Sequence, residues 1–298
     1  MKHSLMSAAS RLPGTIGVGP PRTATTWLDA VLRGHVGLPS GIKETDFFSL
    51  NYGLGIEWYR AHFRNCDPAL PVLEFGPVYF EWPRAPERIA EHIPHCQILV
   101  TLRDPVDRIY SHYQLLRREG WLGAISFEAA LADHERWAER AGNLLSNSRY
   151  AYHLGRWLEV FGAARTLVMI YDDLEAHPQE YLDRVCGFIG IAPVNLANSR
   201  FAHERVNRMT RAPRSPRLAR GARKLRVALE QRGMPRMREF LKPVFTFCAE
   251  GGEPFAPMHP ATEAALRERL RPEIEALEEL LGRDLTAWTR PRARPDPD

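Results

Sequence analysis

Four short apolar runs constrain the fold of this chain more than any other feature of its sequence. They are rich in Val, Ile and Leu and have the length of buried strands: TIGVG (15–19), PVLEF (71–75), QILVTLR (97–103) and RTLVMIY (165–171). Segments with helical spacing of their apolar residues lie between or after them, at 25–32, 107–118, 150–161 and 180–189. This alternation predicts an α/β fold in which a parallel central sheet is flanked by helices.

The segment after the first apolar run has the composition of an anion-binding turn. In such sheets ligands bind beyond the carboxyl ends of the strands. Here PPRTATTW (20–27) offers the guanidinium of Arg22, three threonine hydroxyls and the backbone N–H groups of a helix start, all of which attract anions. The Gly-Lys-Ser/Thr ending of an ATP-binding loop is absent. By itself the segment fits an ordinary strand-to-helix turn equally well.

The segment after the third run, RDPVDRIYSHY (103–113), repeats this arrangement. Arg103 stands at the end of the predicted strand, and a helix is expected to begin at Asp104-Pro105. Ser111 comes eight residues after Arg103, a little over two helical turns further along. One guanidinium and one hydroxyl at this spacing fit a single phosphate. The alternative is a surface pair between Arg103 and a helix-capping Asp104.

Together the two segments resemble the sulfotransferases that use 3′-phosphoadenosine-5′-phosphosulfate (PAPS). PRTATTW is similar to their Pro-Lys-Ser-Gly-Thr-Thr-Trp loop for the 5′-phosphosulfate, and RDPVDRIYSHY to their Arg-x-Pro…Ser motif for the 3′-phosphate. Further segments resemble the heparan-sulfate-type branch: GIKETDFF (41–48), PVYF (77–80), YAYHLGRWLEVF (150–161), MHP (258–260) and LGRDLTAW (281–288). The resemblance covers most of residues 14–290 and implies a P-loop NTPase-like sulfotransferase fold.

The resemblance also implies a function and a set of site residues. The chain is expected to be an enzyme that moves the sulfuryl group from PAPS to an acceptor hydroxyl by in-line displacement, with PAP as product. The acceptor stays open between a glycan, a lipid and a small metabolite. Arg22 is expected to stabilise charge on the leaving oxygen without a metal, and Trp27 to lie beside the adenine. The expected nucleotide-binding residues are Arg22, Thr23, Ala24, Thr25, Thr26, Trp27, Arg103, Ser111 and Tyr150.

A hydroxyl acceptor needs a base that removes its proton. The heparan-sulfate-type branch uses the Glu of its Glu-x-x-Phe-Phe segment, which corresponds to Glu44. The alternative is a solvated Glu44 paired with Lys43 or with an arginine. Other bases that stay open are Asp46, His35, His92 and His95. The expected acceptor-binding residues are Phe47, Phe75 and Tyr79.

The chain departs from the branch pattern at several basic positions. Phe75 and Pro20 stand where the branch has lysines, and FAPMHP (255–260) lacks the basic residues of its Lys-Gly-Arg-x-His-Pro loop. These losses argue against a highly sulfated glycan as acceptor. They also lead us to expect that Arg208 or Arg211 completes the 3′-phosphate site.

Arginine occurs at every third position from 205 to 226, and we call this segment the arginine-rich arm. Residues 200–242 contain 14 Lys and Arg but three acidic residues. Pro213 and Pro216 interrupt a continuous helix, so an extended arm is expected first and a helix near 217–231. We interpret the arm as a lid over PAPS, as an acceptor-binding edge or as a solvated basic helix. A nucleic-acid-binding protein is a further alternative, although the arm holds few aromatic residues for base stacking.

Length and composition fit an ordinary globular enzyme. The 298 residues suit one domain over 14–290, with disordered ends at 1–13 and 291–298. Four scattered cysteines and the lack of a signal-peptide core or a membrane-spanning stretch lead us to expect a cytoplasmic protein with reduced thiols and no metal. The competing enzyme class is a nucleotide or small-molecule kinase, and an inactive PAPS-binding scaffold also stays open. The oligomeric state is not indicated.

Overall fold

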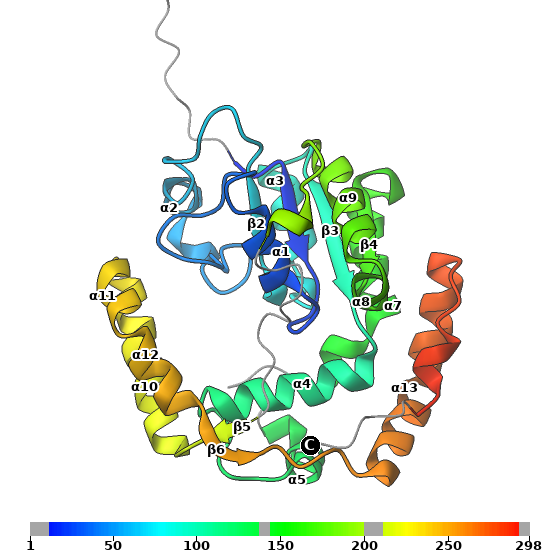
Figure 1. The fold of residues 1–298 in the computed structure, drawn as a ribbon. Coiled ribbons are helices and arrows are strands. Elements are labelled where there is room, and N and C mark those ends of the chain that lie inside the picture. The colour runs from blue at the N-terminus through cyan, green and yellow to red at the C-terminus, as the bar shows by residue number, and fades with distance from the viewer. Residues whose placement is uncertain (1–11, 137–143, 200–210, 292–298) are drawn as a thin grey trace, which may run out of the picture. The chain divides into compact units, whose positions relative to one another are not determined.

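The computed structural model describes residues 12–136, 144–199 and 211–291, and Figure 1 shows its fold. The contacts along the chain divide it into two compact units. The first unit comprises residues 1–102 and 156–206, and the second comprises residues 103–155 and 207–298. The expected disordered ends lie outside the described residues, apart from positions 12, 13 and 291. The boundaries of a single domain over 14–290 stay a prediction.

A four-stranded parallel sheet forms the centre of the first unit, in the order β2-β1-β3-β4. Its strands are β1 (Thr15–Val18), β2 (Leu73–Phe75), β3 (Gln97–Leu102) and β4 (Thr166–Ile170). All four predicted strands are therefore confirmed, with boundaries that differ by two residues or fewer. The inner strand β1 is buried along its whole length, as expected for a parallel strand covered on both faces.

The helices of the first unit cover the sheet (Figure 1). They are α1 (Thr25–Leu32), α2 (Ile56–Ala61), α3 (Ala85–His92), α8 (Tyr171–Ala176) and α9 (Pro178–Ile189). One core cluster joins apolar residues of α1 and α9 to Leu73, Phe75 and Leu99 of the sheet. Because side chains alternate along a strand, Glu74 points to the opposite face of the sheet from its neighbours Leu73 and Phe75.

Two glycines allow β1 and the turn after it to approach their neighbours closely. A Cβ atom on Gly17 would lie 2.3 Å from a ring carbon of Phe75. A Cβ atom on Gly19 would lie 2.4 Å from the carbonyl oxygen of Thr101, and Gly19 also has a φ of +146°. A side chain at either position would therefore push apart the strand ends that present the turn.

The second unit is mostly helical. Its helices are α4 (Pro105–Arg118), α5 (Phe127–Ala132), α10 (Pro216–Gln231), α11 (Pro235–Phe240), α12 (Lys242–Ala249) and α13 (Pro260–Leu281). A small antiparallel pair, β5 (Arg211–Pro213) with β6 (Gly251–Pro254), precedes α10 and follows α12. The helix predicted near 217–231 is confirmed as α10, whereas positions 205–210 of the arm lie outside the described residues. A further helix, α7 (Tyr150–Phe161), runs from the second unit into the first.

Candidate functional site

The turn between β1 and α1 is fixed by a chain of hydroxyl groups. Thr23 is fully buried, and its Oγ1 donates a hydrogen bond of 2.9 Å to the carbonyl oxygen of Pro20. The same oxygen lies 2.7 Å from Oγ1 of Thr101, close to the carboxyl end of β3. The turn is thereby attached to the strand that leads directly into Arg103. Its predicted phosphate contact stays a prediction.

The backbone of this turn is strained at two positions and leaves the start of α1 without a side-chain cap. Arg22 has a φ of +82° and Ala24 has a φ of +76°, a region that side chains with a Cβ rarely adopt. Ala24 is the N-cap of α1 and provides no side-chain hydrogen bond to the helix. The amide groups at the start of α1, including those of Thr25 and Thr26, are thus left to a ligand or to solvent, as in anion sites at helix starts.

Lys43 connects this helix start to the predicted base. Its Nζ donates to Oγ1 of Thr26 at 3.1 Å and to Oε1 of Glu44 at 2.7 Å. The side chains of Lys43 and Glu44 are each about one third exposed, so the pair borders solvent. The Glu44–Lys43 pair considered above is therefore present. The pair also brings Glu44 to the turn, since one ammonium group binds both the carboxylate and a hydroxyl of α1.

A buried carboxylate holds the segment that carries Glu44. Glu74 is fully buried and accepts hydrogen bonds from Tyr59 OH at 2.5 Å, from Tyr79 OH at 3.0 Å and from both the amide and the hydroxyl of Thr45. Burial raises the pKa of Glu74, and the hydroxyl donors offset only part of that effect. Because Thr45 follows Glu44 directly, this cluster determines where the predicted base lies.

Four side chains that are predicted to contact ligands lie in the interior of the first unit. Phe47, Phe75 and Tyr79 are exposed by 1% or less, and Tyr79 directs its hydroxyl at Glu74. Trp27 is also buried and makes an edge contact with Tyr181, with 6.2 Å between ring centroids. Packing explains each of these side chains. Their contacts with an acceptor or with adenine stay predictions.

The alternative bases lie in different surroundings. His92 packs near Phe47 and Phe48 and has its Nε2 3.0 Å from Tyr52 OH, whereas His35 and His95 are exposed. Asp46 forms a turn, since its carbonyl oxygen accepts from the amides of Ser49 and Asn51. Glu44, in contrast, is connected to the start of α1, because Lys43 donates hydrogen bonds to both Glu44 and Thr26.

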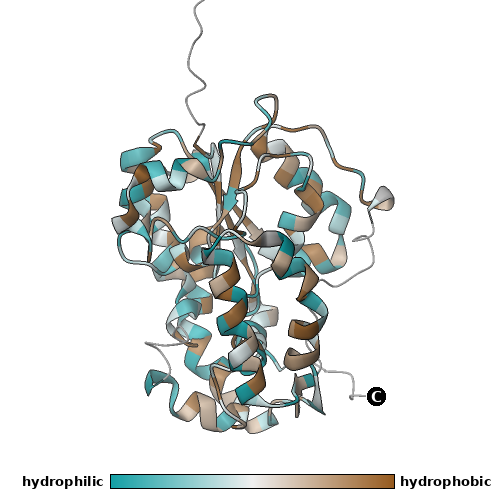
Figure 2. Cartoon of the chain, turned by 90° about the vertical axis from the view of Figure 1, so that its left-hand side faces the viewer, coloured by the Kyte–Doolittle hydropathy of each residue, from teal (hydrophilic) through white to brown (hydrophobic). Residues whose placement is uncertain are grey.

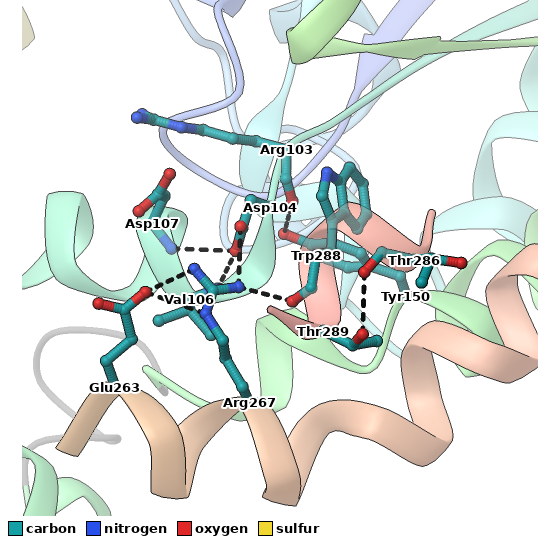
Figure 3. A network of polar contacts seen from close by, with 10 residues as sticks. All are labelled: Arg103, Asp104, Val106, Asp107, Tyr150, Glu263, Arg267, Thr286, Trp288 and Thr289. Carbon is teal, nitrogen blue, oxygen red and sulfur yellow. Dashed lines mark hydrogen bonds and ion pairs between the residues drawn. The ribbon is translucent and has the colours of Figure 1, made fainter. Parts of the chain in front are cut away.

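The second segment predicted to bind phosphate is held by a buried network in the second unit (Figure 3). Asp104 caps α4 by accepting from the amides of Val106 at 2.9 Å and Asp107 at 3.3 Å, as expected for a helix-capping Asp. It also accepts from Nη1 of Arg267 on α13 at 3.0 Å. Arg267 donates further to Glu263 and to the carbonyl oxygen of Trp288. Figure 3 shows the side chain of Arg103 extending away from this network.

Tyr150 supports the same turn. Its hydroxyl donates to the backbone carbonyl oxygen of Arg103 at 3.0 Å, and its ring makes an edge contact with Trp288. Burial raises the pKa of Tyr150, which therefore acts as a neutral donor. Ser111 lies inside α4 and is 8% exposed. The structure thus brings Tyr150 to the Arg103 backbone, and the nucleotide contacts of Tyr150 and Ser111 stay predictions.

The arginines of the described part of the arm make contacts with the end of α4. Arg220 donates to the carbonyl oxygen of Gly120, Arg226 pairs with Glu119 at 2.5 Å, and Arg223 stacks 3.6 Å above the ring of Trp121. Arg211 lies in β5 and donates to the carbonyl oxygen of Gly252. The predicted alternative Arg208 lies outside the described residues. Three arginines of the series therefore anchor α10, which weakens the nucleic-acid interpretation.

Sequence reasoning did not assign a site role to Lys43 or Arg267. Lys43 stands next to Glu44 in the sequence, but its contact with Thr26 joins residues 17 positions apart and depends on the tertiary fold. Arg267 stands in an ordinary charged helix, and no spacing pattern distinguishes it from Arg269 or Arg271. Within residues 12–136, 144–199 and 211–291, no group of three or more metal-ligating side chains is found. No described helix is long and apolar enough to span a bilayer.

Comparison with known proteins identifies the family. The model of the family described as "Sulfotransferase domain" matches residues 13–231, which is more than half of the chain. This chain belongs to the sulfotransferase family. The family resemblance and the α/β fold expected from the sequence are thereby confirmed.

Two relatives illustrate the similarity. The bifunctional heparan sulfate N-deacetylase/N-sulfotransferase 1 of Caenorhabditis elegans is 28% identical over 199 residues, covering 63% of this chain and 23% of that protein. The bifunctional heparan sulfate N-deacetylase/N-sulfotransferase 4 of Mus musculus is 32% identical over 199 residues, covering 61% of this chain and 23% of that protein. The chain thus spans less than a quarter of the length of these relatives.

A solved structure supports the fold. The sulfotransferase from Alicyclobacillus acidocaldarius superposes with a TM-score of 0.68 at 21% identity. The superposition covers 94% of this chain and all of that one. At this identity the likeness concerns the fold alone.

Proposed function

We propose that this chain transfers a sulfuryl group from PAPS to an acceptor, with the β1–α1 turn and the Arg103 motif binding the donor nucleotide. The observation that carries the proposal is the arrangement at the start of α1. An uncapped helix start, the hydroxyl of Thr26, the ammonium group of Lys43 and the carboxylate of Glu44 meet in one place. This arrangement offers anion binding and a proton acceptor side by side.

The donor set of the turn fits a phosphosulfate. The amide groups at the start of α1 suit an anion of this size, Arg22 adds a positive charge, and Lys43 adds an N–H donor beside its partner Glu44. In the proposal, Arg22 and Lys43 stabilise the negative charge that develops on the leaving phosphate oxygen. The strained backbone at Arg22 and Ala24 is consistent with a turn shaped for a ligand.

Arg103 and Ser111 are proposed to hold the 3′-phosphate. The guanidinium of Arg103 provides parallel donors for phosphate oxygens, and Ser111 lies on the helix that begins two residues later. Tyr150 binds the backbone carbonyl oxygen of Arg103, and Arg267 binds the side chain of the next residue, Asp104 (Figure 3). The role proposed for these three residues is to position the motif.

Glu44 is proposed as the base. It would accept the proton of the acceptor group while the acceptor atom bonds to sulfur and the bond from sulfur to the 5′-phosphate oxygen breaks. The shared contact with Lys43 keeps the carboxylate at the turn, where the proton must be removed. The buried cluster around Glu74 supports this placement through Thr45.

The relatives suggest where to search for the acceptor. Both are named as bifunctional heparan sulfate N-deacetylase/N-sulfotransferases, so amino groups of saccharides are candidates beside hydroxyl groups. A screen should include such saccharides, lipid-linked sugars and small alcohols. Transfer is measured as PAP release.

Calorimetric binding of PAP tests the nucleotide part of the proposal. Wild type is expected to bind PAP and to bind ADP much more weakly, because ADP lacks the 3′-phosphate. The Arg103→Ala variant should weaken PAP binding by about 100-fold, the loss typical of a charged hydrogen-bonded pair. An equal loss in the Arg271→Ala variant, whose side chain pairs with Glu268 on the surface of α13, would make the effect unspecific. Preference for ADP or ATP would overturn the proposal in favour of a kinase.

A further inference from the structure

The second unit carries a stripe of exposed apolar side chains along α11 and α12. Met237, Phe240, Val244 and Phe247 are all exposed, and Phe240 is exposed by 79%. Their spacing of three, four and three residues places them on one face of a helix. Large apolar side chains gathered on one surface face, unlike single ones, mark an interaction site.

The stripe is continuous because α11 and α12 are joined in helical conformation. Leu241, between them, has right-handed helical dihedral angles. Its amide donates to the carbonyl oxygen of Met237 at 3.0 Å, and the amide of Phe245 donates to the carbonyl oxygen of Leu241 at 3.0 Å. The side chains before and after Leu241 therefore keep a common face.

The neighbouring helix α10 packs against α12 and also exposes apolar side chains. Leu218 and Leu225 are seven positions apart, so they share a face of α10, and both are exposed. On another side of α10, Arg220, Arg223 and Arg226 attach the helix to the end of α4. Of the eleven large apolar side chains exposed among the described residues, seven lie on α10–α12 or in the turn between them: Leu218, Leu225, Met234, Met237, Phe240, Val244 and Phe247.

The same surface is strongly basic. Residues 216–249 contain nine Lys and Arg against two acidic residues, Glu230 and Glu239. Both acidic residues are neutralised within the segment, Glu230 by Arg238 at 3.1 Å and Glu239 by Lys242 at 2.9 Å. Exposed cations of the segment that are not used in these contacts are Arg217, Lys224, Arg232 and Arg236. Figure 2, viewed from the side where these helices lie in Figure 1, shows hydrophobic and hydrophilic residues interleaved along them.

We propose that the α10–α12 surface docks onto an anionic lipid bilayer. Apolar side chains that insert between headgroups, together with cations that bind lipid phosphates, are the two elements of interfacial binding by amphipathic helices. This kind of binding requires no membrane-spanning helix, because the helices would lie in the plane of the membrane interface. The proposal does not depend on PAPS binding or on sulfuryl transfer.

The charge pattern favours a lipid over other partners. A second copy of the chain would bring two surfaces of the same positive charge together, which is repulsive. The central part of a protein–protein interface is usually depleted of charge, whereas here lysine and arginine stand among the apolar residues. A nucleic acid would use the cations but would leave Phe240, Val244 and the leucines of α10 uncovered.

Co-sedimentation of the full chain with vesicles tests the proposal. Wild type is expected to bind vesicles of equimolar phosphatidylcholine and phosphatidylglycerol and to bind pure phosphatidylcholine much less. The Phe240→Gln/Val244→Gln variant should bind the anionic vesicles about tenfold more weakly. A charge variant, Arg232→Gln/Arg236→Gln, should lose affinity for anionic vesicles and show a weaker dependence on salt.

The control variant is Leu50→Gln/Leu54→Gln, which removes two exposed leucines of the first unit. It should bind vesicles as wild type does. The proposal is overturned if wild type binds neither vesicle, or if the two leucine substitutions weaken binding as much as those at Phe240 and Val244. A wild-type dimer that the Phe240→Gln/Val244→Gln variant converts to monomer would also overturn it, since the stripe would then be a contact between copies.

Discussion

Arg267 donates a hydrogen bond of 3.0 Å to the carboxylate of Asp104, although 163 positions separate the two residues. Both side chains are buried, and both belong to the second unit. Asp104 stands in the Arg103 motif, whereas Arg267 lies beyond residues 13–231 that match the family model. Burial alone would lower the pKa of Arg267, but the carboxylates of Asp104 and Glu263 outweigh it and raise that pKa. The C-terminal helix thus stabilises the turn that presents Arg103.

Replacing Arg267 by Ala should destabilise the protein strongly. The substitution leaves the buried carboxylates of Asp104 and Glu263 without their cation, which typically costs about 3–5 kcal/mol. Urea unfolding measures this loss. The matched control is Arg271→Ala, which removes a surface pair with Glu268 on the same helix and should cost about 1 kcal/mol or less. Equal losses in the two variants would contradict the role assigned to the network.

Replacing Glu44 by Gln should separate catalysis from nucleotide binding. The amide cannot accept the acceptor proton, so PAP release with an acceptor found in the screen should slow by about 10²–10⁴-fold. Calorimetric affinity for PAP should change by about twofold or less, because Arg22, Lys43 and the α1 amides remain. Glu57→Gln, at an exposed pair with Arg60, serves as the control. A variant that keeps its rate would remove Glu44 as the base and return attention to His92 and Asp46.

Replacing Ala24 by Gly should stabilise the protein. Ala24 has a φ of +76°, which a residue with a Cβ adopts at a cost of about 1 kcal/mol that glycine avoids. Ala30→Gly, inside the same helix α1, should instead destabilise by about 1 kcal/mol, because glycine is unfavourable in a helix interior. Thermal unfolding of the two variants should therefore shift in opposite directions. A lower melting temperature for Ala24→Gly would show that the turn is not strained there.

Replacing Glu74 by Gln should change how stability depends on pH. The pKa of Glu74 is raised by burial above its ordinary value of 4.5. The folded protein therefore holds this proton to higher pH than the unfolded chain does. The stability contributed by this group is fully present below about pH 4.5 and is lost as pH rises through the raised pKa. The melting temperature of wild type minus that of Glu74→Gln should thus decrease as pH rises; parallel curves would mean that Glu74 titrates alike in both states.

The sequence alone determined the elements and the family. Continuous apolar runs specify buried strands, and the predicted helices at 25–32 and 150–161 match α1 and α7 at both ends, because apolar spacing and proline or glycine punctuation act locally. The two segments predicted to bind phosphate are also local, since each consists of a strand end, a turn and a helix start. These features could be predicted from neighbouring residues.

Tertiary structure decided what surrounds the motifs. The sheet order β2-β1-β3-β4, the contact of Lys43 with Thr26, the cluster around Glu74 and the pairing of Arg267 with Asp104 all join residues distant in sequence. Burial likewise decided that Trp27, Phe47, Phe75 and Tyr79 lie in the interior, whereas the sequence led us to expect contacts with adenine or the acceptor. The sequence around a charged or aromatic residue shows the same pattern whether its side chain faces a ligand, the protein core or a buried partner. Only the packing of the folded chain distinguishes these environments, because it determines which groups lose their contact with water.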